Sequence, residues 1–183
     1  LAAQAAETLG FPLVLKGMGH AHKSETGAVH LNLWSSQAVA QAAADMDSDG
    51  YLLEQMVTDG VAEVLVAVLR DPAHGFVLTI GAGGVMTEIL MDVATRLVPV
   101  TAQDVRAALT ELRLYPVLRG YRGSPGINID ALIQAVLGVQ SFVLETAAHL
   151  EEVEINPLIC TPDRAVAVDA LITMGVSNDR DTD

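Results

Sequence analysis

Cysteine, basic residues and long apolar runs are all scarce in this chain. Cys160 is the only cysteine, so no internal disulfide can form, and we expect a reducing, cytoplasmic setting. No apolar run is long enough to cross a bilayer, and 10 Lys and Arg against 23 Asp and Glu leave a net charge of −13. A surface this acidic repels nucleic acid and anionic membranes, so we expect neither as a partner. A polyanionic ligand would therefore need local cations and a metal ion.

Several catalytic signatures are absent as well. The chain contains no HExxH or CxxC pattern, which removes the usual basis for a zinc site. It contains neither the GxSxG elbow of a hydrolase nor the GxGxxG turn of a dinucleotide-binding fold. Hydrophobic residues make up 51% of the 183 residues, which is enough for one domain with a core or for two lobes.

The order of the apolar patterns predicts an α+β fold. Continuous or alternating apolar segments predict strands, and apolar stripes at helical spacing predict helices. We expect a helix, two strands, a helix, three strands, two helices and a final hairpin, with largely antiparallel sheets. The residue ranges of these elements are 2–8, 11–18, 28–33, 35–46, 51–57, 61–69, 76–80, 101–113, 129–143, 153–159 and 165–172.

The first candidate site is Lys16, at the end of an apolar strand and before a polar loop that ends at Gly27. A lysine that leaves a buried strand is a fixed charge, and a glycine-bounded loop lets backbone N–H groups approach a phosphate. The alternative is a strand-end lysine with a buried stem, followed by an ordinary solvated loop. On this feature alone the alternative is favoured.

The second candidate site is the segment from Glu54 to Val57, with Glu63 on the next strand. We expect these two strands to be joined by a turn at Asp59–Gly60. Such a pair would offer backbone groups to a purine and a carboxylate to a ribose. The local alternative, a half-exposed hairpin with acidic outer positions, is favoured before other information is added.

The third candidate site is built from Glu154 and Asn156 on one strand and Asp169 on the following one. Residues two apart in a strand share a face, so Glu154 and Asn156 point the same way. A hairpin that turns at Pro162–Asp163 would bring Asp169 near Asn156. One carboxylate and one amide oxygen suit Mg²⁺, which keeps its other positions for water and phosphate. A sheet edge with polar residues facing water is an equally good interpretation.

Two glycine-rich segments carry further polar side chains. Consecutive glycines after a strand either allow close approach to a ligand or make a tight turn. Two arginines in a loop can bind an anion or a partner's carboxylates, or can clamp the loop itself. The first segment contains Gly81, Gly83, Gly84, Glu88, Asp92 and Arg96, and the second is Arg119-Gly120-Tyr121-Arg122-Gly123.

Eight short blocks of the sequence, taken in order, resemble the ATP-grasp region of NDP-forming (ADP-forming) acyl-CoA synthetases. They cover nearly the whole chain, and their order is more specific than any one of them. The blocks are GFPLVLK, HKSETGAV, EQMV, EVLVAVLRDP, the stretch from TIGAGG to TRLVPVT, LRGYRG, EINPL and AVAVDALI. The chain is also similar, more distantly, to the β subunit of succinyl-CoA synthetase.

The resemblance implies a role for each candidate residue. ATP or GTP would be bound with Mg²⁺ between two α+β lobes, and phosphate would pass through histidine. His22 would be a catalytic phosphohistidine, and Asn156 and Asp169 would hold the Mg²⁺. Lys16 would contact the phosphates, the backbone of 54–57 the base, and Glu63 the ribose. The implied nucleotide-binding residues are Lys16, Lys23, Glu54, Gln55, Met56, Val57 and Glu63.

The resemblance also implies a domain organisation and partners. The ATP-grasp region would span 1–175, with a partial first lobe at 1–57, a second lobe at 58–175 and a tail at 176–183. It would be N-terminally incomplete, because a strand–helix unit that precedes the first helix in the family is missing. CoA-binding and CoA-ligase domains or a subunit would complete the enzyme, with a small carboxylic acid and CoA as substrates. The alternative function is a degenerate regulatory ATP-grasp-like domain of a multidomain protein lysine acetyltransferase.

Overall fold

The computed structural model describes residues 2–18, 28–46 and 48–175, and it divides the chain into two compact units. The smaller unit is Leu1–Thr58 and the larger is Asp59–Asp183. Each unit has its own sheet and its own hydrophobic core. No helix in the part of the chain that is described is long and apolar enough to cross a membrane.

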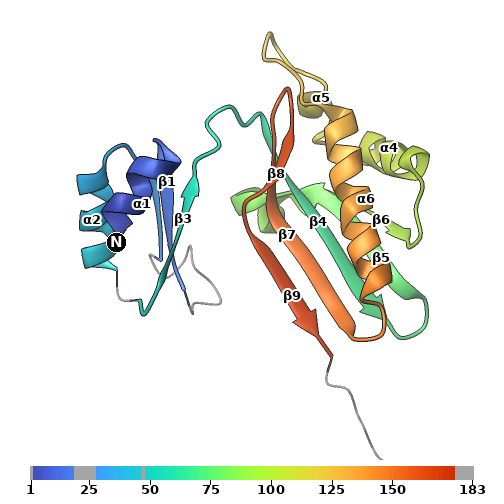
Figure 1. Cartoon of the computed structure of the whole chain (residues 1–183). Helices are drawn as coiled ribbons and strands as arrows, with labels where there is room; N and C mark the ends of the chain where they lie inside the picture. Colours follow the sequence, from blue (N-terminus) through green and yellow to red (C-terminus); the bar gives the residue numbers. More distant parts are fainter. Residues whose placement is uncertain (1, 19–27, 47, 176–183) are drawn as a thin grey trace, which may run out of the picture. The chain divides into compact units, whose positions relative to one another are not determined.

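The smaller unit is a three-stranded antiparallel sheet with two helices on one face (Figure 1). The central strand β1 pairs with both neighbours, so the sheet order is β2-β1-β3. Ser35 caps the second helix, and its side chain accepts a hydrogen bond from the Ala38 amide at 3.1 Å. The elements are α1 (Ala2–Leu9), β1 (Leu13–Gly17), β2 (Val29–Leu33), α2 (Ser36–Asp45) and β3 (Tyr51–Gln55).

Alternation along β1 separates the core of the smaller unit from its candidate site. Leu13 and Leu15 are fully buried and pack with Ala6, Val39 and other residues of the two helices. Successive strand residues face opposite sides of a sheet. Lys16 therefore lies on the face turned away from α1 and α2.

The larger unit is a six-stranded antiparallel sheet with helices packed on one face. The strands run in the order β6-β5-β4-β7-β8, and β9 pairs with the other end of β7. Its strands are β4 (Ala62–Asp71), β5 (Gly75–Ala82), β6 (Val93–Leu97), β7 (Leu150–Cys160), β8 (Ala165–Ala167) and β9 (Ala170–Met174). Its helices are the short η1 (Gly84–Met86), α3 (Thr87–Leu90) and α5 (Tyr115–Leu118), and the longer α4 (Ala102–Glu111) and α6 (Ile129–Glu145).

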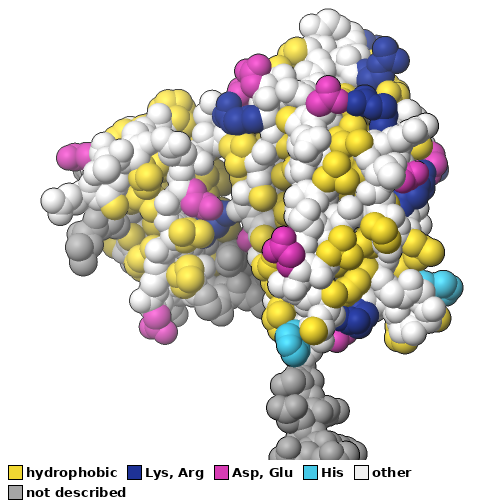
Figure 2. Space-filling view, turned by 45° about the vertical axis from the view of Figure 1, so that its right-hand side comes forward, with side chains coloured by type: hydrophobic (Ala, Val, Ile, Leu, Met, Phe, Trp, Pro, Cys, Tyr) yellow, Lys and Arg dark blue, Asp and Glu magenta, His cyan; other side chains and the backbone are white. Residues whose placement is uncertain are grey.

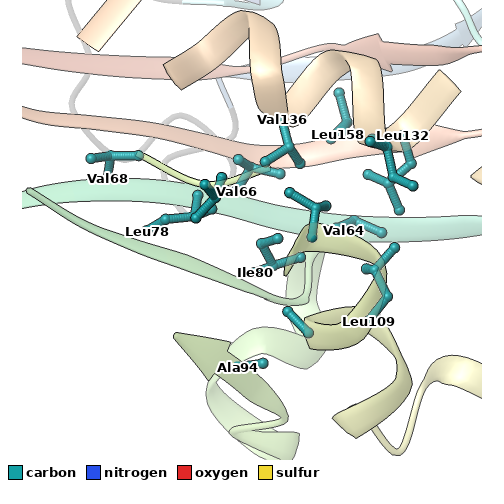
Figure 3. Close-up of a cluster of buried hydrophobic side chains, with 14 of the residues drawn as sticks. Val64, Val66, Val68, Leu78, Ile80, Ala94, Leu109, Leu132, Val136 and Leu158 are labelled. Atoms are coloured by element: carbon teal, nitrogen blue, oxygen red, sulfur yellow. The ribbon is translucent and has the colours of Figure 1, made fainter. Parts of the chain in front are cut away.

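The core of the larger unit lies between the sheet and helices α4 and α6 (Figure 3). Val64, Val66 and Val68 alternate along β4 and are fully buried against this layer. Leu132 and Val136 supply the matching apolar stripe of α6. Each such side chain contributes about 1.5–3 kcal/mol when it is removed from water. We call the opposite side, turned away from α4 and α6, the second face of the sheet.

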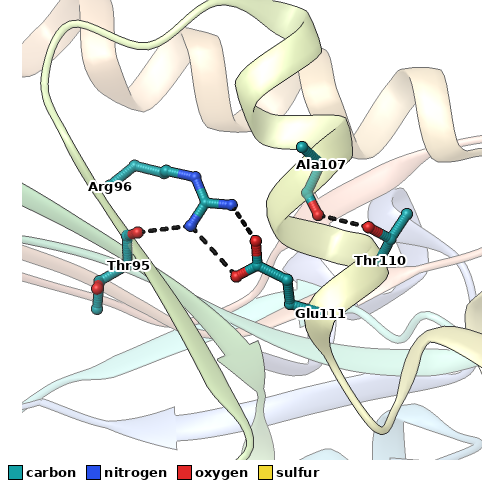
Figure 4. Close-up of polar contacts among 5 residues, drawn as sticks. All are labelled: Thr95, Arg96, Ala107, Thr110 and Glu111. Carbon is teal, nitrogen blue, oxygen red and sulfur yellow. Dashed lines mark hydrogen bonds and ion pairs between the residues drawn. The ribbon is translucent and has the colours of Figure 1, made fainter.

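An ion pair ties the edge strand β6 to α4 (Figure 4). Arg96 contacts both carboxylate oxygens of Glu111, at 2.5 and 3.3 Å, and donates to the Thr95 carbonyl at 2.7 Å. The hydrogen bonds from Arg96 hold the pKa of the Glu111 carboxyl below its usual value. Thr101 caps the start of α4 and forms a capping box with Asp104.

The predicted α+β class with antiparallel sheets is confirmed, but two local predictions are wrong. The strands at 51–57 and 61–69 do not form a hairpin across Asp59–Gly60, because β3 pairs with β1 and β4 pairs with β5 and β7. Strand β6, which pairs with β5, was not predicted from the sequence. The strand predicted at 165–172 is divided into β8 and β9, and Asp169 lies at the division.

The packing of α6 generates a stability prediction. Leu132→Ala removes a fully buried side chain and should lower the free energy of unfolding of the larger unit by about 2–5 kcal/mol. Leu144 on the same helix is 50% exposed, so Leu144→Ala should change the free energy of unfolding by only about 0.5 kcal/mol. Urea unfolding followed by circular dichroism measures both. Equal losses in the two variants would contradict this account of which face of α6 is buried.

Candidate nucleotide and metal site

The glycine turn after β5 brings together residues from three strands of the larger sheet. The Gly83 amide donates to the Glu63 carbonyl on β4 at 2.9 Å. The Gly84 amide donates to Oδ1 of Asn156 on β7 at 2.7 Å. One turn therefore links a strand that carries a predicted ribose-binding residue to a strand that carries a predicted metal ligand.

Gly84 also lies against the Glu63 carboxylate. A Cβ atom added at Gly84 would fall 1.7 Å from Oε2 of Glu63, and the backbone there has a φ of +63°. The left-handed backbone favours glycine at this position, and the missing side chain leaves room for the Glu63 carboxylate. Gly83 and Gly84 are not among the predicted binding residues, although consecutive glycines after a strand are the signal that could have identified them.

Asn156 and Asp169 lie next to each other, as the strand spacing predicts. The backbone amide of Asn156 donates to the backbone carbonyl of Asp169 at 3.2 Å, and the backbone amide of Val168 donates to the Pro157 carbonyl at 3.3 Å. Oδ1 of Asp169 accepts from the Ala170 amide at 3.1 Å. The pairing of β4 with β7 is irregular opposite Leu65, where Asn156 and Pro157 lie. This bulge directs Asn156 toward the glycine turn.

Glu63 and Glu154 share the second face of the sheet with this cluster. Val64 points into the core, so Glu63 points the other way, and Glu154 pairs with Ala67 on the same side. Within residues 2–18, 28–46 and 48–175, no three His, Cys, Asp or Glu gather as a metal-binding group. An ion held by the Asn156 and Asp169 oxygens would thus need ligands from water or from a bound phosphate, as Mg²⁺ commonly does.

Lys16 of the smaller unit lies in a separate polar position. Its Nζ is 2.5 Å from Oε2 of Glu54, a diagonal neighbour across the β1–β3 pair. The residue is only 7% exposed, and its ammonium group is paired with the Glu54 carboxylate in this largely desolvated position. A buried, fixed ammonium of this kind is a suitable contact for a phosphate.

The segment predicted to contact a base is partly occupied by internal bonds. β3 ends at Gln55, whose side-chain amide donates to the Leu9 carbonyl at 2.5 Å. The Met56 amide donates to the Pro12 carbonyl at 3.0 Å. Any purine contact in this segment must therefore use other backbone groups, such as those of Val57.

The remaining polar candidates have structural partners or lie elsewhere. His22 and Lys23 are outside the described residues. The Asp92 carboxylate is 8% exposed and accepts hydrogen bonds from the amides of Arg113 and Leu114 at 2.9 and 2.8 Å. Arg96 is not a phosphate contact in this arrangement, because it pairs with Glu111 on the helix-covered side of the sheet.

The other arginines divide into paired and exposed ones. On the surface in Figure 2, most Lys and Arg side chains lie beside Asp or Glu side chains. Arg106 and Arg164 pair with Asp130 and Asp59. Arg119 and Arg122 are exposed, have no ion pair among the described residues, and Arg122 stacks on its neighbour Tyr121. The loop that carries them is therefore a surface feature separate from the Asn156 cluster.

Comparison with known proteins places this geometry in a family. The family model of the ATP-grasp domain matches residues 1–174. The chain is similar to the β subunits of the ADP-forming acetate–CoA ligases I and II of Pyrococcus furiosus. Subunit I is 34% identical over 175 residues, which cover 88% of this chain and 75% of the relative. Subunit II is 32% identical over 184 residues, which cover 92% and 78%.

A solved structure gives the same result. It is the dinucleotide-forming acetyl-coenzyme A synthetase 1 of Ca. Korarchaeum cryptofilum, in complex with coenzyme A and Mg-AMPPCP, with its phosphohistidine segment pointing towards the nucleotide binding site. The match has a TM-score of 0.85 and 31% identity, and it covers 94% of this chain and 81% of that chain. The predicted ATP-grasp fold and family resemblance are thus confirmed. The chain belongs to the ATP-grasp domain family, as the ATP-grasp module of an ADP-forming acyl-CoA synthetase.

Proposed function

We propose that this chain binds Mg²⁺·ATP and transfers its γ-phosphoryl group during reversible formation of an acyl-CoA, ADP and phosphate from a carboxylic acid, CoA and ATP. The observation that carries the proposal is the cluster of Glu63, Gly84, Asn156 and Asp169, which the glycine turn, β4, β7 and the β8–β9 junction bring together. Phosphoryl transfer depends on positioning and charge neutralisation, and this cluster offers oxygen ligands in a fixed arrangement.

Asn156 and Asp169 are the proposed ligands of the metal. The amide oxygen of Asn156 accepts from Gly84 and retains a second lone pair. Together with a carboxylate oxygen of Asp169 it would hold Mg²⁺ by two protein oxygens, while the nucleotide phosphates and water complete the octahedron. The Korarchaeum relative was solved with Mg-AMPPCP, which supports this choice of metal and nucleotide.

Lys16 is the proposed contact of the smaller unit with the phosphates. The chain has a net charge of −13, so its overall field opposes an anionic nucleotide. A buried ammonium and the metal would neutralise the phosphates locally. Lys23 is proposed for the same task, the backbone of 54–57 for the base, and Glu63 for the ribose. GTP would fit the same groups if the base contacts allow it.

The chemical step that we propose passes through histidine. An imidazole nitrogen attacks the γ-phosphorus, the bond to the β,γ-bridging oxygen breaks, and ADP leaves. The phosphoryl group then moves to a carboxylate oxygen of the acid, and the CoA thiol displaces inorganic phosphate from the acyl phosphate. A phosphohistidine segment is described in the Korarchaeum relative. We propose His22 as a second phosphohistidine that accepts the group within this chain.

The remaining parts of the enzyme are proposed from its relatives. Two of them are β subunits of ligases, so CoA-binding and CoA-ligase domains, on another subunit or on the same polypeptide, would supply the acid and CoA sites. We further propose that the region 1–175 acts as two lobes, 1–57 and 58–175. The relatives reported above are ligases or synthetases, so they give no support to a purely regulatory function.

Asp169 provides the first test of the metal site. Asp169→Ala should weaken Mg²⁺-dependent ATP binding by about 10- to 100-fold, because one of two protein oxygens on the metal is lost. The measurement is calorimetric titration of the full chain with ATP, with and without Mg²⁺. Asp163→Ala, in the exposed turn between β7 and β8, removes the same charge and should leave the affinity within about twofold. Unchanged affinity in Asp169→Ala would remove the metal assignment.

Lys16 provides a test in the smaller unit. Lys16→Met keeps the buried stem but removes the ammonium, and it should reduce ATP affinity by about 10- to 100-fold, the value of one charged hydrogen bond. The same titration measures the loss. Thermal unfolding checks that the smaller unit is still folded. Wild-type affinity in a folded Lys16→Met variant would restrict Lys16 to its ion pair with Glu54.

His22 is tested by activity in the complete enzyme with its CoA-ligase part. His22→Ala should lower kcat by at least about 100-fold, because the nucleophile is lost, while ATP binding by the chain stays near wild type. His20→Ala is the matched control in the same segment and should retain activity. Normal turnover by His22→Ala would contradict a phosphohistidine at this position.

A further inference from the structure

Gly84 differs from Gly75 and Gly123, two other glycines of the larger unit that have a left-handed backbone. Gly75 and Gly123 have φ values of +82° and +88°, and a Cβ added at either would meet nothing within 4 Å. At Gly84 the corresponding space is filled, since Oε2 of Glu63 lies 1.7 Å from the Cβ position and Cδ lies 2.9 Å from it. The carboxylate of Glu63 therefore lies directly against the Gly84 backbone, where a side chain would otherwise stand.

The backbone of Gly84 is occupied on its other side. Its amide donates to Oδ1 of Asn156 at 2.7 Å, although the two residues are 72 positions apart in the chain. Of the two ends of a side-chain amide only the oxygen can accept a hydrogen bond, so this bond places Oδ1 and not Nδ2 of Asn156 toward the turn. The orientation of the proposed metal ligand is thus set by Gly84.

The turn itself is held against β4 by Gly83. The Gly83 amide donates to the Glu63 carbonyl at 2.9 Å, and a Cβ added at Gly83 would fall 2.6 Å from the Val64 carbonyl carbon. The fully buried Val64 side chain anchors that part of β4 in the core. The turn that contacts the Glu63 and Asn156 side chains is therefore attached to a part of β4 that is buried in the core.

We propose that Gly84 is a positioning residue that couples the metal ligand Asn156 to the ribose-binding carboxylate Glu63. The inference rests on the proposed function and adds that recognition of Mg²⁺ and recognition of the ribose are not independent. The Gly84 N–H donates to the side-chain oxygen of Asn156, and the missing Cβ leaves room for the Glu63 carboxylate. A shift of this turn would therefore affect both side chains. The site accordingly selects a ribonucleotide in its magnesium complex.

The test compares Gly84→Ala with Gly123→Ala in the full chain. Both variants place alanine in the left-handed region, but only Gly84→Ala forces the Glu63 carboxylate away from the turn. Calorimetric titrations use ATP with and without Mg²⁺, and the 2′- and 3′-deoxy analogues of ATP with Mg²⁺. Gly84→Ala should lose at least about tenfold of the Mg²⁺ enhancement, together with the preference for ATP over the deoxy analogues. Gly123→Ala should match wild type within about twofold, and identical behaviour of the two variants would overturn the proposal.

A second measurement uses the unliganded chain and separates this inference from the proposed function. Asn156→Ala should speed hydrogen exchange of the Gly84 amide at least about tenfold, as followed by NMR, while Asp163→Ala leaves it unchanged. An unchanged Gly84 amide in Asn156→Ala would overturn the positioning role whether or not ATP binds. If the wild-type chain binds no Mg²⁺·ATP, the proposed function fails. Accelerated exchange in Asn156→Ala would then still show that Asn156 and Gly84 are bonded to each other, and unchanged exchange would overturn that as well.

A double-mutant cycle covers the case in which Gly84→Ala does not fold. Glu63→Gln and Asn156→Ala leave the turn backbone intact, and their combined effect on the dissociation constant for Mg²⁺·ATP should differ at least about threefold from the product of the single effects. Additive effects of the two substitutions would overturn the coupling. Folding of each variant is verified by its thermal unfolding.

Discussion

Alternation along strand β4 is the constraint on which the larger unit depends. Successive side chains of a strand face opposite sides of a sheet, so Val64, Val66 and Val68 pack beneath α4 and α6 while Glu63 is turned to the other side. A shift of one residue in the pairing of β4 with β5 or β7 would bury the carboxylate and expose the valines. The burial that stabilises the core therefore also sets the position of the candidate site.

Most of the few arginines in this acidic chain that were considered for the site already have carboxylate partners. Arg96, Arg106 and Arg164 are bound to carboxylates that join separate segments of the larger unit. They are consequently not available for a nucleotide. The cluster around Asn156 and Asp169 contributes oxygen atoms, which suit a metal and not a bare phosphate. Under the proposed function, this arrangement would favour a magnesium complex over free ATP.

The accuracy of the sequence-based predictions depended on the distance between the interacting residues. Helix starts were predictable because the capping residues Ser35 and Thr101 lie within three positions of the amides they bind. The proximity of Asn156 and Asp169 was predictable because one hairpin joins them. The role of Arg96 and the strand β6 were not predicted, because each depends on packing against β5 and α4 and not on a local pattern.

The sequence by itself determined the element types, the antiparallel α+β class and the family, since periodicity, caps and the order of short blocks are local properties of the chain. Only the tertiary structure decided that β3 and β4 belong to different sheets, although only residues 56–61 lie between them. It also decided that Gly84, noted only as part of a glycine-rich turn, binds Asn156 across 72 positions. The physical reason is that strand partners and close backbone contacts are selected by the packing of the whole sheet, whereas propensity acts over a few residues.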